Sequence, residues 1–212
     1  MRNCFAISLL LGLPAMIAIA VSPLGCASRE SAKNVAEDRP AVPLNPVVVI
    51  ETSMGKIVAE LWADKAPKSV ANFLQYVDGK FYDGLIIHRI VPGFVIQGGG
   101  FTADLQFKQP KDFIQNEARS DVRNARGTLS MARMAQIHSA NSQFFINLVN
   151  NGMWDHIDET PAGYGYCVFG KVIQGMDIVD TIAKVATSTP APGMEGVPVT
   201  PVVIKSVLRQ AK

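Results

Sequence analysis

One arginine stands inside an otherwise apolar stretch, "GLIIHRIVPGFVIQGGGF", which covers residues 84–101. Arg89 is charged at every working pH, and its guanidinium presents several N–H groups in a fixed geometry. Such a group can stabilise an electron-rich atom by donating hydrogen bonds, without itself gaining or losing a proton. Phe94 and Gln97 follow in the same stretch, which raises the question of whether the three form one site. Taken alone, a strand arginine more often extends its charged end into solvent.

Other kinds of chemistry are disfavoured by the residues that would have to carry them. None of the three histidines has the spacing of metal ligands, and Ser142 lacks the G-x-S-x-G setting of a hydrolase nucleophile. The segment "GYCVFGKV" (165–172) approaches a phosphate-binding loop, but Val172 replaces the hydroxyl residue that would hold magnesium. We therefore expect no metal, no nucleotide and no other cofactor.

Three further features have plain structural interpretations. His88 precedes Arg89, and neighbours on a regular strand point to opposite faces, so His88 is expected to be a structural hydrogen-bonding residue. The glycine run 98–100 lacks the spacing of a dinucleotide fingerprint and predicts a tight bend. The acidic residues of 155–159 predict a solvated surface loop.

Length and composition bound the class of protein. The chain has 212 residues, of which 48% are hydrophobic, and a net charge of +2. This suits one globular domain with additional segments. The basic residues are scattered and form no polybasic tail, so nucleic acid is not expected as a partner.

The N-terminal residues 1–26 are typical of an export signal. Arg2 precedes a short apolar run that is interrupted by glycine and proline, a pattern that differs from a stable membrane span. Leu24-Gly25-Cys26 resembles the lipobox of bacterial lipoproteins, in which the cysteine is lipidated, although Pro23 holds the place of the usual leucine. The alternative is an ordinary signal that is cleaved after Ala27. We expect an exported, periplasmic protein that is tethered to a membrane through Cys26.

Hydrophobic periodicity predicts a domain of mostly short strands. Residues 27–46 have the polar, proline-containing composition of a linker, and a folded domain is expected over 47–212. A hairpin opens this domain, followed by a helix that starts near Pro67 and ends at Gly79. About eight short strands and a second helix at 175–185 complete the count. The missing βαβ alternation favours an antiparallel barrel or sandwich, and the pattern leaves that choice open.

Four segments in order carry a resemblance to a known family. "IHRIVPGFVIQGGGF", "RNARGTLSMARM", "NSQFFINL" and "YGYCVFGKVIQGMDIVD" are similar to the motifs of the cyclophilin-type peptidyl-prolyl cis-trans isomerases, most like the periplasmic bacterial form. The resemblance covers residues 47–210. It implies an all-β fold with two short helices, a closed eight-stranded antiparallel barrel, and catalysis of rotation about X-Pro bonds.

The resemblance also assigns roles to individual residues. It implies that Arg89 is catalytic and that Gln97 helps to orient it. The residues implied to bind substrate are Phe94, Val95, Met131, Ala132, Arg133, Gln143, Phe145, Trp154 and Tyr166, with Ala132 and Arg133 acting through their backbone. Phe94, Phe145 and Trp154 would form the proline pocket.

One position departs from the family pattern. Met153 falls where eukaryotic members carry the tryptophan that binds cyclosporin, so cyclosporin-type ligands are expected to bind weakly. A one-residue shift in a loop of different length would instead bring the indole of Trp154 to that position.

Two functions remain open from the sequence. The first is an exported isomerase that assists folding of unfolded, proline-containing exported proteins, acting as a monomer. The second is a binding module that holds proline-containing segments without needing catalysis. The combination of Arg89, Gln97 and Gln143 favours the enzyme, because a pure binder would not need all three.

Overall fold

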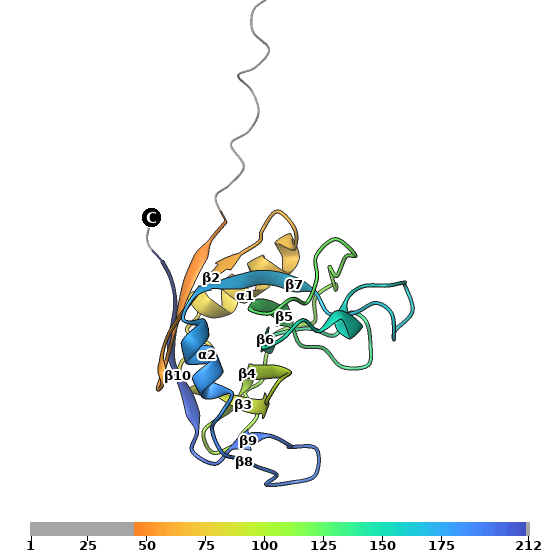
Figure 1. The fold of residues 1–212 in the computed structure, drawn as a ribbon. Coiled ribbons are helices and arrows are strands. Elements are labelled where there is room, and N and C mark those ends of the chain that lie inside the picture. Colours follow the sequence, from red (N-terminus) through yellow and green to blue (C-terminus); the bar gives the residue numbers. More distant parts are fainter. Residues whose placement is uncertain (1–44, 211–212) are drawn as a thin grey trace, which may run out of the picture. The chain divides into compact units, whose positions relative to one another are not determined.

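Eight antiparallel strands close into a barrel in the computed structural model, which describes residues 45–210 (Figure 1). The barrel strands are β1 (Val47–Thr52), β2 (Gly55–Leu61), β3 (Leu85–Val91), β4 (Val95–Thr102), β5 (Thr128–Met131), β6 (Phe144–Asn147), β7 (Val168–Gln174) and β10 (Val202–Arg209). They follow one another around the barrel in the order β1-β10-β3-β4-β6-β5-β7-β2. Closure leaves no exposed edge for pairing with another chain. The prediction of a closed eight-stranded barrel is confirmed.

Two helices and three short elements complete the fold. The helices are α1 (Pro67–Asp78) and α2 (Met176–Ile182), and the short elements are the 3-10 helix η1 (Gly152–Trp154) and the strand pair β8 (Thr187–Ser188) and β9 (Val197–Pro198). α1 begins and ends where the sequence predicted, whereas α2 is shorter than the predicted helix at 175–185. No helix among the described residues is long and apolar enough to span a membrane.

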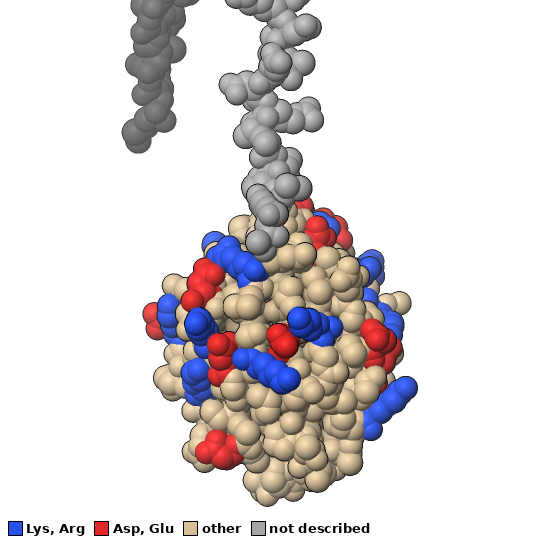
Figure 2. Space-filling model, turned by 90° about the vertical axis from the view of Figure 1, so that its left-hand side faces the viewer, with Lys and Arg blue, Asp and Glu red and all other residues tan. Residues whose placement is uncertain are grey.

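The predicted export signal, Cys26 and most of the predicted linker lie outside the described residues. Within the barrel domain, charges of both signs are interspersed on the face drawn in Figure 2.

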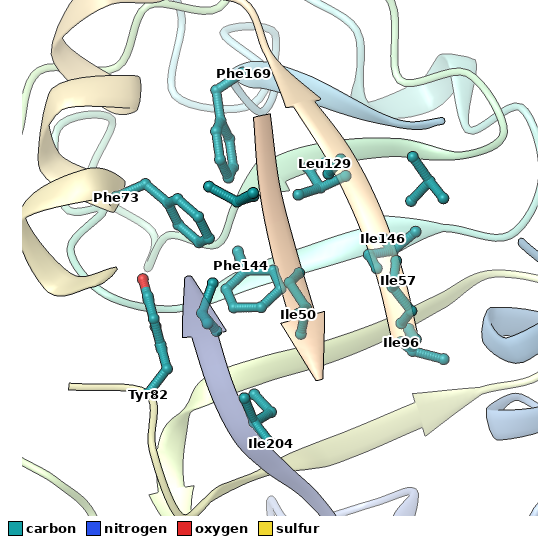
Figure 3. Close-up of a cluster of buried hydrophobic side chains, with 14 of the residues drawn as sticks. Ile50, Ile57, Phe73, Tyr82, Ile96, Leu129, Phe144, Ile146, Phe169 and Ile204 are labelled. Carbon is teal, nitrogen blue, oxygen red and sulfur yellow. The ribbon is translucent and has the colours of Figure 1, made fainter. Parts of the chain in front are cut away.

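Apolar side chains from every barrel strand fill the interior. Ile96, Ile146 and Leu129 are directly opposite one another on β4, β6 and β5, and all three are buried. Phe73 of α1 covers one end of the barrel, where its ring lies 5.4 Å from that of Phe144 (Figure 3). Because each barrel strand has one face in this core, the residues that alternate with the core residues face outward.

A distant carboxylate caps the start of α1. The N-cap residue, Ala66, offers no side-chain hydrogen bond. Glu117 takes this role from the loop after β4, since it accepts hydrogen bonds from the backbone N–H groups of Lys68 (3.0 Å) and Ser69 (2.7 Å). A negative charge at a helix N-terminus is favourable. The contact ties the long segment between β4 and β5 to the helix that covers the barrel.

Cys167 is buried, as its apolar surroundings in the sequence predicted. Only 2% of its surface is exposed, and burial raises the pKa of its thiol to about 11. Its sulfur lies 3.3 Å from the hydroxyl of Ser69. The thiol is therefore protonated at neutral pH and serves as a small packing residue.

Candidate active site

The pairing register brings the central residues of the candidate site together on the outside of the barrel. Arg89 on β3 is opposite Gln97 on β4, which is opposite Phe145 on β6. Residues directly opposite each other on neighbouring strands have side chains on the same face. Their neighbours in the chain, Ile96 and Ile146, occupy the core face. The row therefore spans three adjacent strands, about 10 Å between its outer members.

Two glutamines extend this row as a hydrogen-bonded pair. Nε2 of Gln97 donates to Oε1 of Gln143 at 3.0 Å. Gln143 lies against the backbone of β4, because a Cβ placed on Gly100 would stand 2.7 Å from its amide nitrogen. The predicted tight bend at glycines 98–100 is wrong, since the run continues β4. The absence of a side chain at Gly100 instead makes room for Gln143.

Arg89 is half-buried and forms no ion pair with any carboxylate that the structure describes. An arginine that stabilised the barrel would be expected to have such a partner. The guanidinium is instead free to donate to a molecule that binds beside the row.

Four aromatic rings adjoin the row. The ring of Trp154 lies 4.4 Å from that of Phe94 and 5.0 Å from that of Phe145, measured between centroids, and both pairs are edge to face. Tyr166 joins them, with its ring 4.5 Å from Trp154 and 5.6 Å from Phe145. We call these four residues the aromatic cluster. Edge-to-face packing of this kind is favourable and rigid.

The turn between β3 and β4 places Phe94. Its backbone N–H donates to the carbonyl of Val91 at 3.0 Å across Pro92 and Gly93. Gly93 has a φ of 71°, which a residue with a side chain rarely adopts. The predicted hairpin across Pro92-Gly93 is therefore present, and it delivers Phe94 to the same end of the row as Trp154.

Arg133 uses its side chain to fasten loops. Its guanidinium donates to the carbonyl oxygens of Gly165 (2.9 Å), Pro161 (3.0 Å) and Met134 (3.1 Å), and lies 4.8 Å from the ring centroid of Tyr166. These contacts occupy its donors. Any contact of Arg133 with substrate would then come from its backbone, as the family resemblance implies.

Two candidate residues are set apart from the others. The side chain of Met131 is 1% exposed and belongs to the barrel core, where it is opposite Phe144. Val95 is completely buried beside the row, opposite Asn147. Met131 therefore supports the site from within the barrel, whereas Val95, two residues before Gln97 on β4, lies on the same face of the sheet as the row.

The indole of Trp154 lies in the aromatic cluster, whereas 76% of the surface of Met153 is exposed. The structure therefore shows Met153, and not Trp154, at the outward-facing position of η1. Weak cyclosporin binding stays a prediction.

Two hollows border the site. One, of about 530 Å³, opens beside Gln97 and Gln143 and is also lined by Ala132 and the exposed ring of Phe113. The other, of about 630 Å³, lies against Trp154. Among residues 45–210, no group of three or more His, Cys, Asp or Glu side chains could hold a metal ion.

A family model described as cyclophilin type peptidyl-prolyl cis-trans isomerase/CLD matches residues 47–208. The chain belongs to this cyclophilin family. Peptidyl-prolyl cis-trans isomerase cyp18 of Streptomyces antibioticus is 50% identical over 159 residues, which are 75% of this chain and 95% of that protein. Peptidyl-prolyl cis-trans isomerase B of Escherichia coli (strain K12) is 47% identical over 162 residues, 76% of this chain and 98% of that protein.

The fold has a solved counterpart. A Cryptosporidium parvum cyclophilin-type isomerase, crystallised in the presence of the dipeptide Ala-Pro, matches with a TM-score of 0.65 and 24% identity, covering 78% of this chain and 99% of that one. The sequence prediction of an isomerase of the cyclophilin type is confirmed, which favours the enzyme over the pure binding module.

A bulge in this cyclophilin changes the direction of His88. Ile87 pairs with Gly98 and Arg89 with Gln97, so His88 has no partner of its own on β4. An extra residue of this kind breaks the alternation of side chains. The alternation on which the predicted opposite placement of His88 and Arg89 rested therefore does not hold here, and the buried ring of His88 lies 4.8 Å from that of Phe101.

Sequence reasoning also missed the role of Asp155. The cyclophilin loop 155–159 was expected to be solvated, but Asp155 is only 8% exposed. Its Oδ1 accepts a hydrogen bond from the backbone N–H of Asn124 at 2.7 Å. The apolar Trp154 beside it and the asparagine-rich run 147–151 were the only signals that this part of the loop is buried.

Burial lowers the pKa of His88 from 6.5 to about 4, against a smaller opposing contribution from Gln143. Its Nδ1 has no hydrogen-bond partner in the described part of the chain. Below pH 6.5 the unfolded chain therefore binds a proton that the folded protein excludes. Stability falls as the pH drops from 6.5 to 4, by about 3 kcal/mol from this residue alone.

We expect His88→Gln to flatten this pH dependence. Urea unfolding at pH 7 and pH 4.5 measures it, and the difference between wild type and variant removes the contribution of the carboxylates. The wild type should lose about 2–3 kcal/mol more than the variant between the two pH values. Parallel losses in both proteins would contradict a buried, neutral His88.

Proposed function

We propose that this isomerase turns X-Pro bonds by seating the proline ring in the aromatic cluster while Arg89 donates hydrogen bonds to the nitrogen of the twisted amide. The observation that carries the proposal is the row of Arg89, Gln97 and Phe145, because it sets an unpaired guanidinium beside an apolar surface. The proposed mechanism requires that the guanidinium and the proline-binding surface are close enough to act on one X-Pro bond.

The barrier comes from delocalisation of the amide nitrogen lone pair into the carbonyl, and it amounts to ~18–20 kcal/mol. Before proline the two isomers differ by only ~0.5–1 kcal/mol, yet they exchange over tens to hundreds of seconds. A catalyst therefore breaks no covalent bond. It has to bind the twisted amide more tightly than either planar isomer.

In the twisted amide the proline nitrogen becomes pyramidal and recovers its lone pair. A hydrogen-bond donor aimed at this nitrogen stabilises the twist, whereas the planar amide offers it a much poorer acceptor. Arg89 suits this role because it is permanently charged and presents its donors in one plane. A bound proline segment would exclude water from the guanidinium, and a hydrogen bond is stronger in a site without water. Gln97 would hold the guanidinium in place.

The aromatic cluster would bind the proline ring by burial. Trp154 packs against Phe94 and Phe145, at 4.4 Å and 5.0 Å between ring centroids, so the proline ring would lie against the face that these packed rings present. The chain before the proline would lie along the hollow beside Gln97 and Gln143. The proline ring would then be held on one side of the X-Pro bond and the preceding chain on the other. Rotation about this bond is the motion that remains.

We further propose that the enzyme acts outside the cytoplasm, on unfolded exported proteins. The supporting pattern is the basic and apolar N-terminus with Leu24-Gly25-Cys26. Cys26 would carry the lipid, and residues 27–46, which have the composition of a linker, would connect it to the barrel domain. Several acyl chains are needed for a stable anchor, because a single chain binds a bilayer only marginally.

Replacing Arg89 tests the mechanism. We expect Arg89→Ala to lower kcat/KM about 100-fold, as the removal of a key transition-state donor does in other enzymes. Arg89→Lys keeps the charge but lacks the planar set of donors, so it should recover only part of the loss. Isomerisation of a proline tetrapeptide, followed by a protease-coupled assay or NMR exchange, measures it. Arg119→Ala is the control, since Arg119 is exposed and pairs only with Asp121. An Arg89→Ala enzyme within about threefold of wild type would reject the mechanism.

Replacing Cys26 tests the anchor. In a Gram-negative host that expresses the full chain, the wild type should sediment with membranes and carry the added mass of a lipid. Cys26→Ser should leave the protein without the lipid and outside the membrane fraction. If wild type and variant are both recovered as soluble protein of unmodified mass, the lipoprotein proposal fails and the signal is simply cleaved.

A further inference from the structure

Three of the four rings in the aromatic cluster stand on backbone that the barrel ladder does not hold. Trp154 and Tyr166 lie in the long segment between β6 and β7, whose only regular element is the three-residue η1. Phe94 lies in the turn before β4. Something other than strand pairing must fix the positions of these residues relative to Phe145 on β6.

A ring of buried polar side chains lies directly beneath them. Asn151 Nδ2 donates to Oδ1 of Asn147 at 2.7 Å, Asn147 Nδ2 donates to Oγ of Ser130 at 3.3 Å, and Ser130 Oγ donates to Oδ1 of Asn124 at 2.7 Å. The backbone N–H of Asn151 then donates to the carbonyl of Asn124 at 2.8 Å and closes the ring. We call these four residues the asparagine frame.

The frame is almost inaccessible to water. Asn124 is 1% exposed, Asn151 is 6% exposed, and Ser130 and Asn147 are fully buried. None of their side-chain nitrogen or oxygen atoms is left without a partner. Buried amide groups satisfied in this way are rigid, because any displacement would strand a donor or acceptor in an apolar interior.

The ends of the frame hold the three loop-borne residues of the aromatic cluster. Asn151 Nδ2 donates to the carbonyl of Phe94 at 3.1 Å. Asn124 Nδ2 donates to the carbonyl of Trp154 at 2.8 Å and to that of Tyr166 at 3.3 Å. Amides suit this task, since each combines donors for the loop carbonyls with an acceptor for the next member of the frame.

The fourth ring is connected to the frame through the ladder. Phe145 is directly opposite Ser130, and Asn147 lies two residues further along the same face of β6. The frame therefore fixes the positions of all four rings relative to one strand pair, β5 and β6. Asp155 supports it from the loop, where its carboxylate accepts from the backbone N–H of Asn124 at 2.7 Å.

We propose that Asn124 and Asn151 are positioning residues for the isomerase, which set the separation of the rings that grip proline. This inference rests on the proposed proline pocket and adds the residues that hold its rings in position. The frame touches no substrate. Loss of either asparagine should let the loop-borne rings shift, and shifts on the order of 1 Å are enough to weaken a positioned site considerably.

The test separates positioning from simple loss of stability. Asn124→Ala and Asn151→Ala should each raise KM for a proline peptide about tenfold, with kcat within about threefold of wild type. A partly unfolded sample would behave differently, because it lowers the apparent kcat and leaves KM unchanged. Thr52→Ala is the matched control: Thr52 is 2% exposed and donates to the carbonyl of Gly55, but it lies on β1, across the barrel from β6.

Fluorescence gives a second readout that does not depend on activity. The chain has two tryptophans, so Trp62→Phe leaves Trp154 as the sole indole emitter. In that background, either frame substitution should shift the Trp154 emission and increase its quenching by acrylamide, whereas Thr52→Ala should change neither. If an alanine variant does not fold, Asn124→Ser or Asn151→Ser keeps one donor and should show a smaller change in the same direction.

The outcomes are distinct. Unchanged KM and unchanged Trp154 emission in both frame variants would overturn the inference, as would equal changes in Thr52→Ala. The KM of Phe145→Ala, measured in the same assay, distinguishes a failure of the asparagine frame from a failure of the proposed pocket. If Phe145→Ala raises KM and the frame variants do not, only the asparagine frame is wrong. If Phe145→Ala also leaves KM unchanged, the proposed pocket fails together with the inference drawn from it.

Discussion

The register between β3, β4 and β6 is the constraint on which the site depends. Side chains alternate across a strand with a period of two, so one pairing decides both what fills the barrel and what faces out. With Ile96 opposite Ile146 in the core, Gln97 must be opposite Phe145 on the other face of the sheet, where Trp154 and Tyr166 cover Phe145. A slip of one residue would bury Gln97 and expose an isoleucine. The burial of apolar side chains thus holds the candidate catalytic row in place, although Arg89 and Gln97 are outside the barrel core.

Hydrogen bonds of the loops place the parts of the site that the barrel strands do not. Strand pairing alone places only Phe145 of the four rings. The remaining three reach it through buried amides, and Arg133 fastens the backbone beside Tyr166 with the same kind of bond to loop carbonyls. A rigid scaffold that carries a site on hydrogen-bonded loops agrees with the general finding that binding residues concentrate in loops. The cost is a large number of buried polar groups, each of which has to be satisfied.

Much of the fold could be predicted because the local signals agree with one another. Pro67 and Gly79 delimit α1, and Pro92-Gly93 marks the hairpin that carries Phe94. Features that depend on distant partners could not be predicted. Glu117 caps a helix from far along the chain, and Asp155 is buried because Asn124 happens to face it. Neither contact leaves a pattern in the sequence.

The structure brings together most of the residues that the motifs indicated, but their geometry could not be predicted from the sequence. Ordered motifs indicated the residues, but the alternation rule failed at His88, where a bulge adds one residue to β3. Bulges occur near active sites because they redirect side chains, and here the bulge lies immediately before Arg89. The glycine run that follows Gln97 was predicted to form a bend, because glycines within a strand often mark one. Its lack of side chains serves the close approach of Gln143, which only the three-dimensional structure reveals.

Catalysis as proposed requires that the prolyl bond is held beside the unpaired guanidinium of Arg89 and the aromatic cluster. A crystal structure of the protein with a short Xaa-Pro peptide would measure this directly. We expect the proline ring against the aromatic cluster of Phe94, Phe145 and Trp154, with a guanidinium nitrogen of Arg89 about 3 Å from the prolyl amide. A peptide bound with its proline elsewhere, or an Arg89 side chain directed away from it, would contradict the central claim.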